Sequence, residues 1–318
     1  MSHLSNPLAT AEQLYKKASV NDLPAELQDS ILFFTARLTQ AAGVLLRLPQ
    51  DVTAQANVLL FRYWLVDGLM QHEFSELSAA TIYMTAKISA SPRSLRSITN
   101  VYAYLTSPNS SLSTPNSNPP PDPESYYLSE STYITNRNRL LHIEGQLLNA
   151  LGFNTHVALP HPLAITYLQA LDVFAASRSQ KGKSAGTEVG KRAIEYLNTA
   201  LLSPQMLYLT HQPCALATTA VYLAARDKGV KLPDVEWWEV FDCEREELGF
   251  LAVAMGSLEG VVRREMERWG EGKAMITRAD IRGEMEKMGT ALGSGGAAEV
   301  EDEEAEMARL MDEKVAAQ

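Results

Sequence analysis

Hydrophobic side chains recur along most of the chain at steps of three and four residues. This spacing gathers apolar side chains on one stripe of an α-helix. It predicts a helix from residue 27 that Pro49 terminates, with a stripe of Leu27, Ile31, Phe34, Leu38, Ala41 and Leu45. Residues 137–151 repeat the pattern, and Gly152 is suited to cap their C-terminal end. No hairpin signal of alternating strands around Asn-Gly or Asp-Gly is visible, so the sequence predicts an all-α fold.

Two segments, residues 77–86 and 214–225, contain no charged residue and are rich in small side chains. They align without a gap at an offset of 139 positions, and a basic residue follows each, Lys87 and Arg226. A helix without charge on any face must be surrounded by others, and small side chains let neighbouring helices approach closely. We therefore predict a duplication, with two bundles of about five helices and one Ala-rich buried helix at the centre of each. A chance likeness of two Ala-rich helices is the alternative.

Three polar or proline-containing segments are expected to interrupt the helices. Between residues 106 and 125, seventeen of twenty residues are Ser, Thr, Asn or Pro, which predicts a disordered insertion within residues 106–131. Pro160 and Pro162 predict a short, stiff, non-helical linker over residues 154–162. The Gly, Ser and Lys residues of 177–190 predict a flexible connection between helices. The resulting boundaries are an N-terminal extension at 1–26, a first bundle at 27–157, a second bundle at 158–265 and a helical, acidic C-terminal tail at 266–318.

Composition and charge exclude several classes of protein. With 318 residues, 46% of them hydrophobic, the chain can bury a large core without disulfides or metals. Cys214 and Cys243 are too few for a disulfide framework and are expected to be intracellular thiols. Nowhere do 18 apolar residues follow one another without a charge, so neither secretion nor a membrane partner is expected.

The net charge of −10 lies largely in the C-terminal tail, because residues 299–318 hold eight acids and two bases, a net charge of −6. No cluster of five or more Lys and Arg occurs, so we expect no direct binding of nucleic acid.

Motifs for catalysis or metal binding are incomplete. Residues 182–184 resemble the end of a phosphate-binding loop, but that motif requires glycine at position 177, which is Ser177 here. No second pair of ligands supports a zinc site around the isolated candidates His156, His161, His211 and Cys214. No nucleophile motif such as Gly-x-Ser-x-Gly is present. We therefore expect no catalytic residue, no cofactor and no metal.

Several stretches of the chain resemble the cyclin L family, over roughly residues 25–265. They are residues 40–50, 85–105, 133–157, 159–171 and 221–233. The most specific are AGVLLRLPQ and LGFNTHV, since ordinary cell-cycle cyclins do not carry them in this form, and cyclins K and T match less closely. The resemblance implies the cyclin fold, so that the two predicted bundles would be tandem cyclin boxes.

The resemblance also implies a function. Cyclins L are regulatory subunits that form heterodimers with cyclin-dependent kinases of the PITSLRE type, in transcription by RNA polymerase II and in pre-mRNA splicing, which would place the chain in the nucleus. A Lys and a Glu of the first cyclin box face the kinase in this family, and they match Lys87 and Glu144 here. The neighbouring apolar contact surface would consist of Ile88, Leu148, Leu151 and Phe153.

The residues themselves support a Lys87–Glu144 pair. Glu144 lies within the apolar stripe of its helix, where no cation stands three or four positions away, so it needs a partner from elsewhere. Lys87 ends an uncharged helix and is the obvious candidate. A lysine oriented by a carboxylate can donate its remaining N–H groups to another chain. In the alternative, Lys87 only complements its helix C-terminus and Glu144 lies at the solvated edge of the stripe.

Some features depart from the family. Ser89 and Ala90 stand where relatives usually carry two acids, and residues 27–48 lack the Met-Arg-Ala-Ile-Leu motif with which cell-cycle cyclins recruit substrates. The chain ends in acidic residues, whereas animal cyclins L end in Arg-Ser-rich tails. Ser107 and Thr114 each precede a proline and are possible phosphorylation sites.

Two other functions remain open. A cyclin-fold transcription-factor module would contact DNA and other proteins without a kinase, and a basic face on the second bundle would favour it. Residues 234–247 are instead rich in acids. A stand-alone helical scaffold is the other alternative.

Overall fold

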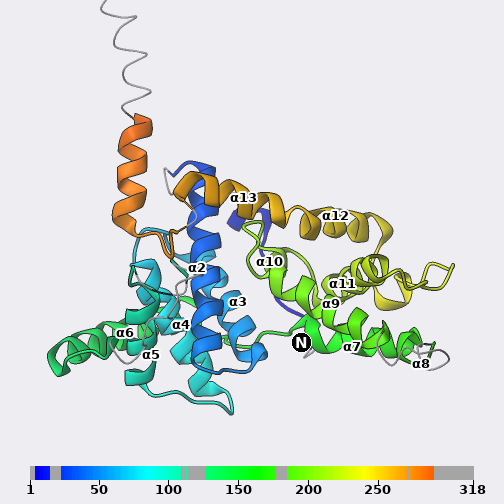
Figure 1. Ribbon diagram of the computed structural model, residues 1–318, viewed down its shortest axis with the longest axis horizontal. Coiled ribbons are helices and arrows are strands. Elements are labelled where there is room, and N and C mark those ends of the chain that lie inside the picture. Colours follow the sequence, from blue (N-terminus) through cyan, green and yellow to red (C-terminus); the bar gives the residue numbers. More distant parts are fainter. Residues whose placement is uncertain are drawn as a thin grey trace, which may run out of the picture. The chain divides into compact units, whose positions relative to one another are not determined.

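The computed structural model describes residues 4–14, 23–108, 110, 112–113, 126–176, 185–270 and 272–289. Every regular element within these residues is a helix, and none is a strand (Figure 1). The predicted all-α class is therefore confirmed. None of the described helices is both long and apolar enough to cross a membrane.

The first bundle surrounds the helix that contains the uncharged residues 77–86, as the sequence predicts. It consists of α2 (Ala25–Leu45), α3 (Gln50–Val66), α4 (Phe74–Ile88), α5 (Leu95–Leu105) and α6 (Glu130–Ala150). Helix α4 packs against all four of the others. Its Ala80, Ile82 and Ala86 are fully buried.

The second bundle is built in the same way around the helix that contains the uncharged residues 214–225. Its elements are α7 (Pro160–Ala170), α8 (Val173–Ala176), α9 (Ala185–Ala200), α10 (Leu207–Thr210), α11 (Pro213–Lys228), the 3-10 turn η2 (Glu239–Phe241) and α12 (Arg245–Gly256). Helix α11 packs against α7, α9 and α12, and its Ala217, Ala220 and Ala224 are fully buried. The following helix, α13 (Leu258–Trp269), returns to the first bundle, where it crosses α2 (Figure 1).

The predicted insertion is shorter than expected at both ends. Helix α6 begins at Glu130, after Ser129 accepts a hydrogen bond from the backbone N–H of Thr132, so residues 130–131 are helical. At the other end Ser110 is fully buried, and the carbonyl of Leu112 accepts a hydrogen bond of 3.3 Å from Arg37 of α2. Small polar side chains and the half-buried guanidinium of Arg37 thus hold the start of this segment on the core. Residues 109, 111 and 114–125 lie outside the described part of the chain.

The expectation that Pro160 and Pro162 prevent helix formation is wrong. Helix α7 begins at Pro160, and the linker is reduced to residues 154–159. The first turn of a helix has no acceptor for its N–H groups, so proline loses nothing there and its fixed φ suits the helix. The predicted linker over 177–190 is also partly helical, since α9 begins at Ala185, and residues 177–184 lie outside the described part.

The apolar stripe of α2 is buried as predicted only as far as Leu38. Beyond it, Ala41 is half-buried and Leu45 is 42% exposed, while Leu46 is buried. The end of the helix is held by Arg93, whose guanidinium donates hydrogen bonds of 2.8 Å to the carbonyls of Leu46 and Arg47. This contact ties the loop that follows α4 to the end of α2.

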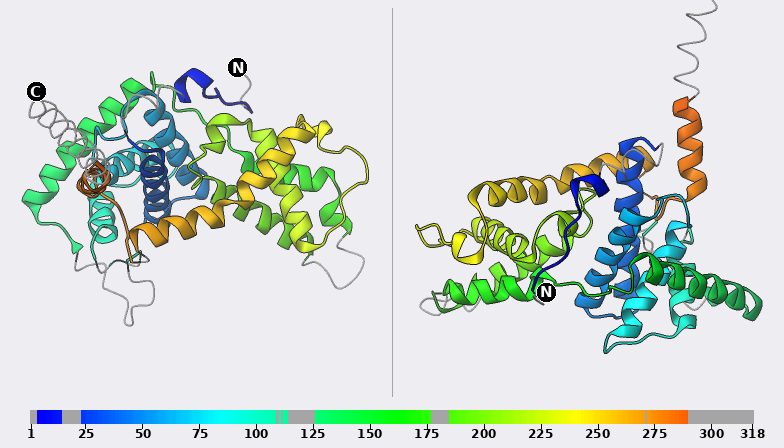
Figure 2. Two further views of the ribbon diagram at one scale, coloured as in Figure 1. Left: turned by 90° about the horizontal axis from the view of Figure 1, so that it is seen from above. Right: turned by 180° about the vertical axis from the view of Figure 1, so that it is seen from behind.

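Residues 4–14, called the N-terminal strap below, run between the two bundles (Figure 2). The side chain of buried Asn6 donates to the carbonyl of Ala158 and accepts from its N–H, both at 2.8 Å. The Asn6 backbone exchanges two hydrogen bonds of 3.0 Å with the side chain of Gln212, which precedes α11. The strap therefore contacts the linker and the second bundle, while Arg62 of the first bundle donates to Asn6 at 3.2 Å.

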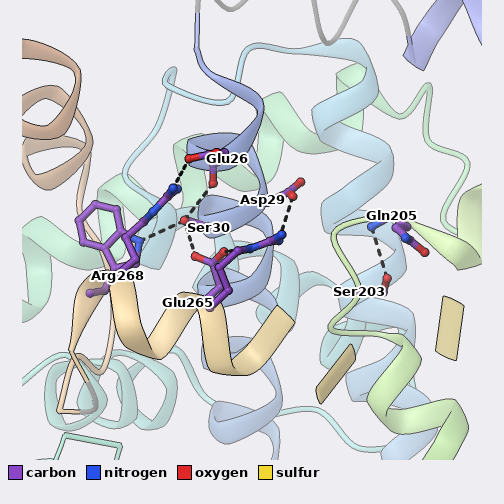
Figure 3. Close-up of polar contacts among 9 residues, drawn as sticks. Glu26, Asp29, Ser30, Ser203, Gln205, Glu265 and Arg268 are labelled. Carbon is purple, nitrogen blue, oxygen red and sulfur yellow. Dashed lines mark hydrogen bonds and ion pairs between the residues drawn. The ribbon is translucent and has the colours of Figure 1, made fainter. Parts of the chain in front are cut away.

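Helix α13 is fastened to α2 by a buried carboxylate (Figure 3). Glu265 is fully buried and accepts a hydrogen bond from the hydroxyl of Ser30, which also accepts one of 3.0 Å from the indole of Trp269. Arg264 and Arg268 form ion pairs with Asp29 and Glu26 at the rim of this contact.

The predicted boundary at residue 265 falls too early. Ala274, Met275 and Ile276 are buried, and the compact unit that holds both bundles extends to Ile276. A second unit begins at Thr277. Its helix spans residues 278–289 and starts with reciprocal hydrogen bonds between Thr277 and Asp280.

Candidate functional site

The predicted pair of Lys87 and Glu144 is present. Lys87 is in the last turn of α4 and Glu144 is in α6, and the Lys87 Nζ lies 3.2 Å from the Glu144 Oε1. The Glu144 side chain is 8% exposed, whereas that of Lys87 is 55% exposed. The structure thus brings together two residues separated by 57 positions, with the carboxylate shielded and the ammonium accessible.

The burial of Glu144 follows from the helix that carries it. Leu140, Ile143 and Leu147 are buried in α6 on either side of it, so the carboxylate points into an apolar contact between α6 and α4. The alternative that Glu144 lies at a solvated edge is therefore wrong. A shielded carboxylate needs a cation or hydrogen-bond donors, and Lys87 is the cation in reach. Lys87 also complements the negative end of the α4 dipole, so both roles apply to it.

Lys87 is oriented but retains donors for another molecule. Its ammonium group has three N–H donors, and one of them is directed to Glu144. Its Nζ also lies 5.5 Å from the ring centre of Tyr83, one turn earlier in α4. The remaining donors are at the surface, where they can reach backbone carbonyls or carboxylates of a second chain.

Partly exposed apolar side chains follow both members of the pair in the sequence: Ile88 directly after Lys87, and Leu148, Leu151 and Phe153 after Glu144. Ile88 is 52% exposed and Phe153 is 68% exposed, while Leu148 and Leu151 are half-buried. Phe153 has a φ of +58°, directly after Gly152 with a φ of +56°, where the chain turns away from α6. Left-handed backbone is unfavourable for a residue other than glycine by about 1 kcal/mol. The fold therefore holds a large aromatic side chain at the surface in a conformation that costs energy.

Three more residues at or near this surface are not evident from the sequence. Val66, the last residue of α3, is 62% exposed and lines a cavity together with Leu151 and with Leu8 of the N-terminal strap. Gly145 follows Glu144, and a Cβ atom there would meet nothing within 4 Å, so the backbone of α6 is open to close approach. Val66 and Leu8 are remote from Leu151 in the sequence, and no local pattern marks them.

A second ion pair joins the same two helices and serves as a comparison. Arg139 of α6 lies 3.2 Å from Glu76 of α4, the same distance as in the first pair. Both side chains are well exposed, at 63% and 36%. Exposed pairs of this kind contribute little to stability, at most about 1 kcal/mol. The Lys87–Glu144 pair differs because its carboxylate is shielded from water.

The structure describes one of the two predicted phosphorylation sites and the loop after Lys87. Ser107 is half-buried and donates a hydrogen bond of 2.7 Å to the carbonyl of Tyr104, while Thr114 lies outside the described residues. Ser89, in place of an acid, donates to the carbonyl of Ala86 at 2.9 Å. No acidic network therefore follows Lys87 within the described loop; Arg93 holds this loop instead.

The candidate histidines and cysteines do not form a metal site within the described residues. Among the described residues, no three His, Cys, Asp or Glu side chains are placed to hold a metal ion. His211 stacks on the ring of Phe250, with 5.4 Å between the ring centres. Cys214 and Cys243 are free thiols, and burial raises the pKa of Cys243 to about 12. The motif at 182–184 lies outside the described residues.

Comparison with known proteins gives relatives in one family. The chain is 31% identical to human Cyclin-L1 over 228 residues, which are 71% of this chain and 39% of that protein. It is 27% identical to human Cyclin-L2 over 284 residues, 85% of this chain and 50% of that protein. The chain thus spans half or less of the length of these relatives. No family model matches the chain.

Solved structures share the fold at low sequence identity. A chain of the yeast RNA Pol II CTD kinase CTDK-1 complex superimposes with a TM-score of 0.58 and 12% identity, covering 84% of this chain and 77% of that one. A chain of the CAK complex of Chaetomium thermophilum bound to ATP-gamma-S has a TM-score of 0.51 and 17% identity, covering 81% and 72%. At these identities the likeness concerns the fold alone.

Proposed function

Since the chain is a cyclin-fold homologue of cyclins L1 and L2, we propose that it is the regulatory subunit of a cyclin-dependent kinase and carries out no catalysis itself. The partner we favour is a kinase of the PITSLRE type, with which the chain forms a heterodimer. The process is transcription by RNA polymerase II or pre-mRNA splicing, in the nucleus.

The observation that carries this proposal is the contact between Lys87 and Glu144. A shielded carboxylate fixes an accessible lysine; exposed Ile88 directly follows Lys87, and exposed Phe153 follows the helix that carries Glu144. The central part of a protein interface is usually apolar, and a charged group there contributes to binding only when the partner chain pairs it. Lys87 would donate to acceptors on the kinase, and the apolar side chains would pack against it.

The chemistry would belong to the kinase. A protein kinase is active when the lysine of its third strand pairs with a glutamate of its αC helix and its activation loop is ordered. A subunit that binds this assembled state more tightly than the open state shifts the equilibrium towards it. An interface that holds αC in this way would bury about 2,000 Å² in total.

Two observations bear on the cellular context. The chain shares its fold with a chain of a complex described as an RNA Pol II CTD kinase, which is in keeping with transcription. The chain contains no cluster of basic residues for nuclear import, so its entry would depend on the kinase or another partner. The alternative of a DNA-contacting adaptor without a kinase finds no support in the acidic residues 234–247, which would repel phosphates.

The proposal is tested by capture of a PITSLRE-type kinase with variants of the pair. We expect Glu144→Ala and Lys87→Glu each to reduce capture at least about tenfold, which corresponds to about 1.4 kcal/mol of binding free energy. The matched control is Arg139→Ala, which breaks the exposed ion pair between the same two helices. That control should leave capture unchanged, and all three variants should keep the helical circular dichroism of the parent chain.

A kinase assay with and without the chain completes the test. Kinase activity should rise when the parent chain is added and should not rise with Glu144→Ala at the same concentration. Undiminished capture by both Glu144→Ala and Lys87→Glu would refute the docking site. Capture of a promoter complex without any kinase would favour the adaptor.

A further inference from the structure

Helix α12 in the second bundle has one buried face and one open face (Figure 1). The buried face consists of Leu248, Leu251, Ala254 and Met255. On the opposite side Phe250 is 55% exposed and Val253 is 73% exposed. An exposed apolar face on a helix, unlike single exposed apolar residues, indicates an interaction surface.

The open face is shaped to receive another helix. Glu246, Gly249, Phe250, Val253 and Gly256 follow one another at steps of three, one, three and three residues, which places them on one side of α12. All of them are exposed. A Cβ atom added at Gly249 or Gly256 would meet nothing within 4 Å, so a neighbouring backbone can approach closely between the larger side chains.

The aromatic side chain on this face is held in position. The ring of Phe250 stacks on that of His211 with an angle of 24° between the planes. Burial lowers the pKa of His211, so the imidazole is neutral at physiological pH and the contact is a stack of two uncharged rings. Phe250 therefore loses little conformational freedom when a partner binds, which favours binding.

The start of α12 carries several acids close together. The acids are Asp242, Glu244, Glu246 and Glu247, and Arg245 is the single base among them. Burial, together with the charges of Glu244 and Asp242, raises the pKa of Glu247, as expected for neighbouring carboxylates. None of the ion pairs between described residues involves these four carboxylates. This end of the open face is therefore complementary to positive charge.

We propose that the open face of α12 binds a helix of another protein that has an apolar stripe and Lys or Arg residues in its last turn. Cations in the last turn are favourable for the partner's own helix dipole. An antiparallel arrangement would place that turn over the acids at the start of α12 and the apolar stripe over Phe250 and Val253. The twelve residues of α12 provide a contact about 18 Å long.

Charge makes two other occupants unfavourable. The acidic residues 299–318 of this chain, with a net charge of −6, would be repelled by the carboxylates at the start of α12. A second copy in antiparallel register would place those carboxylates opposite Gly256 and Ser257, which offer no cation. The proposal does not depend on the kinase, because Lys87 and Glu144 belong to the first bundle.

The test is photo-crosslinking with the full-length chain in cells. The crosslinking amino acid p-benzoylphenylalanine replaces Val253, and a matched control carries it in place of Val240 of η2, which is 81% exposed but lies outside α12. We expect a crosslink from position 253, and not from position 240, to a segment of another protein that forms an amphipathic helix ending in Lys or Arg. The double substitution Glu244→Lys and Glu246→Lys should lower the yield about fivefold or more, the effect of losing two attractions of about 0.5 kcal/mol each.

Each other outcome would overturn the proposal. These outcomes are a crosslink to a second copy, to this chain's own residues or to an acidic segment, and the absence of any crosslink from position 253. A yield that the double substitution leaves unchanged would show that charge does not select the partner. Circular dichroism and the unfolding temperature of each variant show whether the bundle is intact, so that loss of the crosslink is not loss of the fold.

Discussion

The substitution Asn6→Ala would test how firmly the N-terminal strap is held. The Asn6 side chain is 6% exposed and makes three hydrogen bonds. It accepts from the N–H of Ala158 at 2.8 Å and from Arg62 at 3.2 Å, and it donates to the carbonyl of Ala158 at 2.8 Å. Alanine removes all three and leaves the peptide groups of Ala158 without these partners in a buried position.

The expected loss of stability is about 2–4 kcal/mol. Each hydrogen bond contributes about 1 kcal/mol net, and a buried group that is left unsatisfied costs about 1–3 kcal/mol. Arg62 limits the loss because it still donates to the carbonyl of His156 at 2.7 Å. Burial lowers the pKa of Arg62, which shows that its charge is poorly solvated and depends on such acceptors. Asn6→Asp should cost less than Asn6→Ala, since it keeps the acceptor for Arg62 and Ala158.

Urea unfolding followed by circular dichroism measures this effect. The control is Asn154→Ala, a substitution of the same type at an exposed residue of the linker, which should change stability by less than about 0.5 kcal/mol. If Asn6→Ala and Asn154→Ala unfold at the same urea concentration, the strap contributes nothing to the stability of the unit, and the reasoning from its hydrogen bonds is wrong.

Two further predictions concern the half-buried His161 and the buried Gly43. His161 donates a hydrogen bond of 2.9 Å from its Nε2 to Asn198, and its Nδ1 is buried without a described partner. Burial lowers the pKa of His161 in the folded chain. As the pH falls, the unfolded chain therefore takes up a proton at this residue before the folded chain does. The free energy of unfolding should therefore be highest above the ordinary histidine pKa of about 6.5 and should fall as the pH decreases below it. In His161→Gln this fall should be less steep. Equal urea midpoints at pH 7 and pH 5 in the parent chain would contradict this. Gly43→Ala would place a Cβ atom 2.2 Å from the Thr53 Oγ1 and should destabilise by about 1–3 kcal/mol, whereas Gly145→Ala meets nothing within 4 Å and should stabilise by about 0.5–1 kcal/mol. Thermal unfolding should shift in opposite directions for the two alanine variants, and a shift in the same direction would contradict the close approach of α2 and α3.

The arrangement of the candidate site could be predicted because the patterns that indicate it lie within single helices. Glu144 stands in an apolar stripe without a cation one turn away, and this pattern favours a partner from another helix. Lys87 follows the uncharged residues 77–86 of α4, which make that helix central and bring its end next to α6. The exposed apolar residues of the candidate site were only partly predictable from the sequence, because Val66 belongs to a different helix and its exposure depends on how α3 ends.

The sequence by itself determined the helical class and the two central helices, and together with the family resemblance it indicated the pairing of Lys87 with Glu144. Periodicity and missing charge act within single helices, so they can be read along the chain. Only the tertiary structure decided that α13 is fastened to α2 through Glu265 and Ser30, residues 235 positions apart, and that the strap contacts both bundles. The tertiary structure also showed that Pro160 begins a helix and that one face of α12 is open. Whether a polar side chain is buried with hydrogen-bond partners, or an apolar side chain is left exposed, depends on which distant segments of the chain pack together. No local pattern in the sequence contains that information.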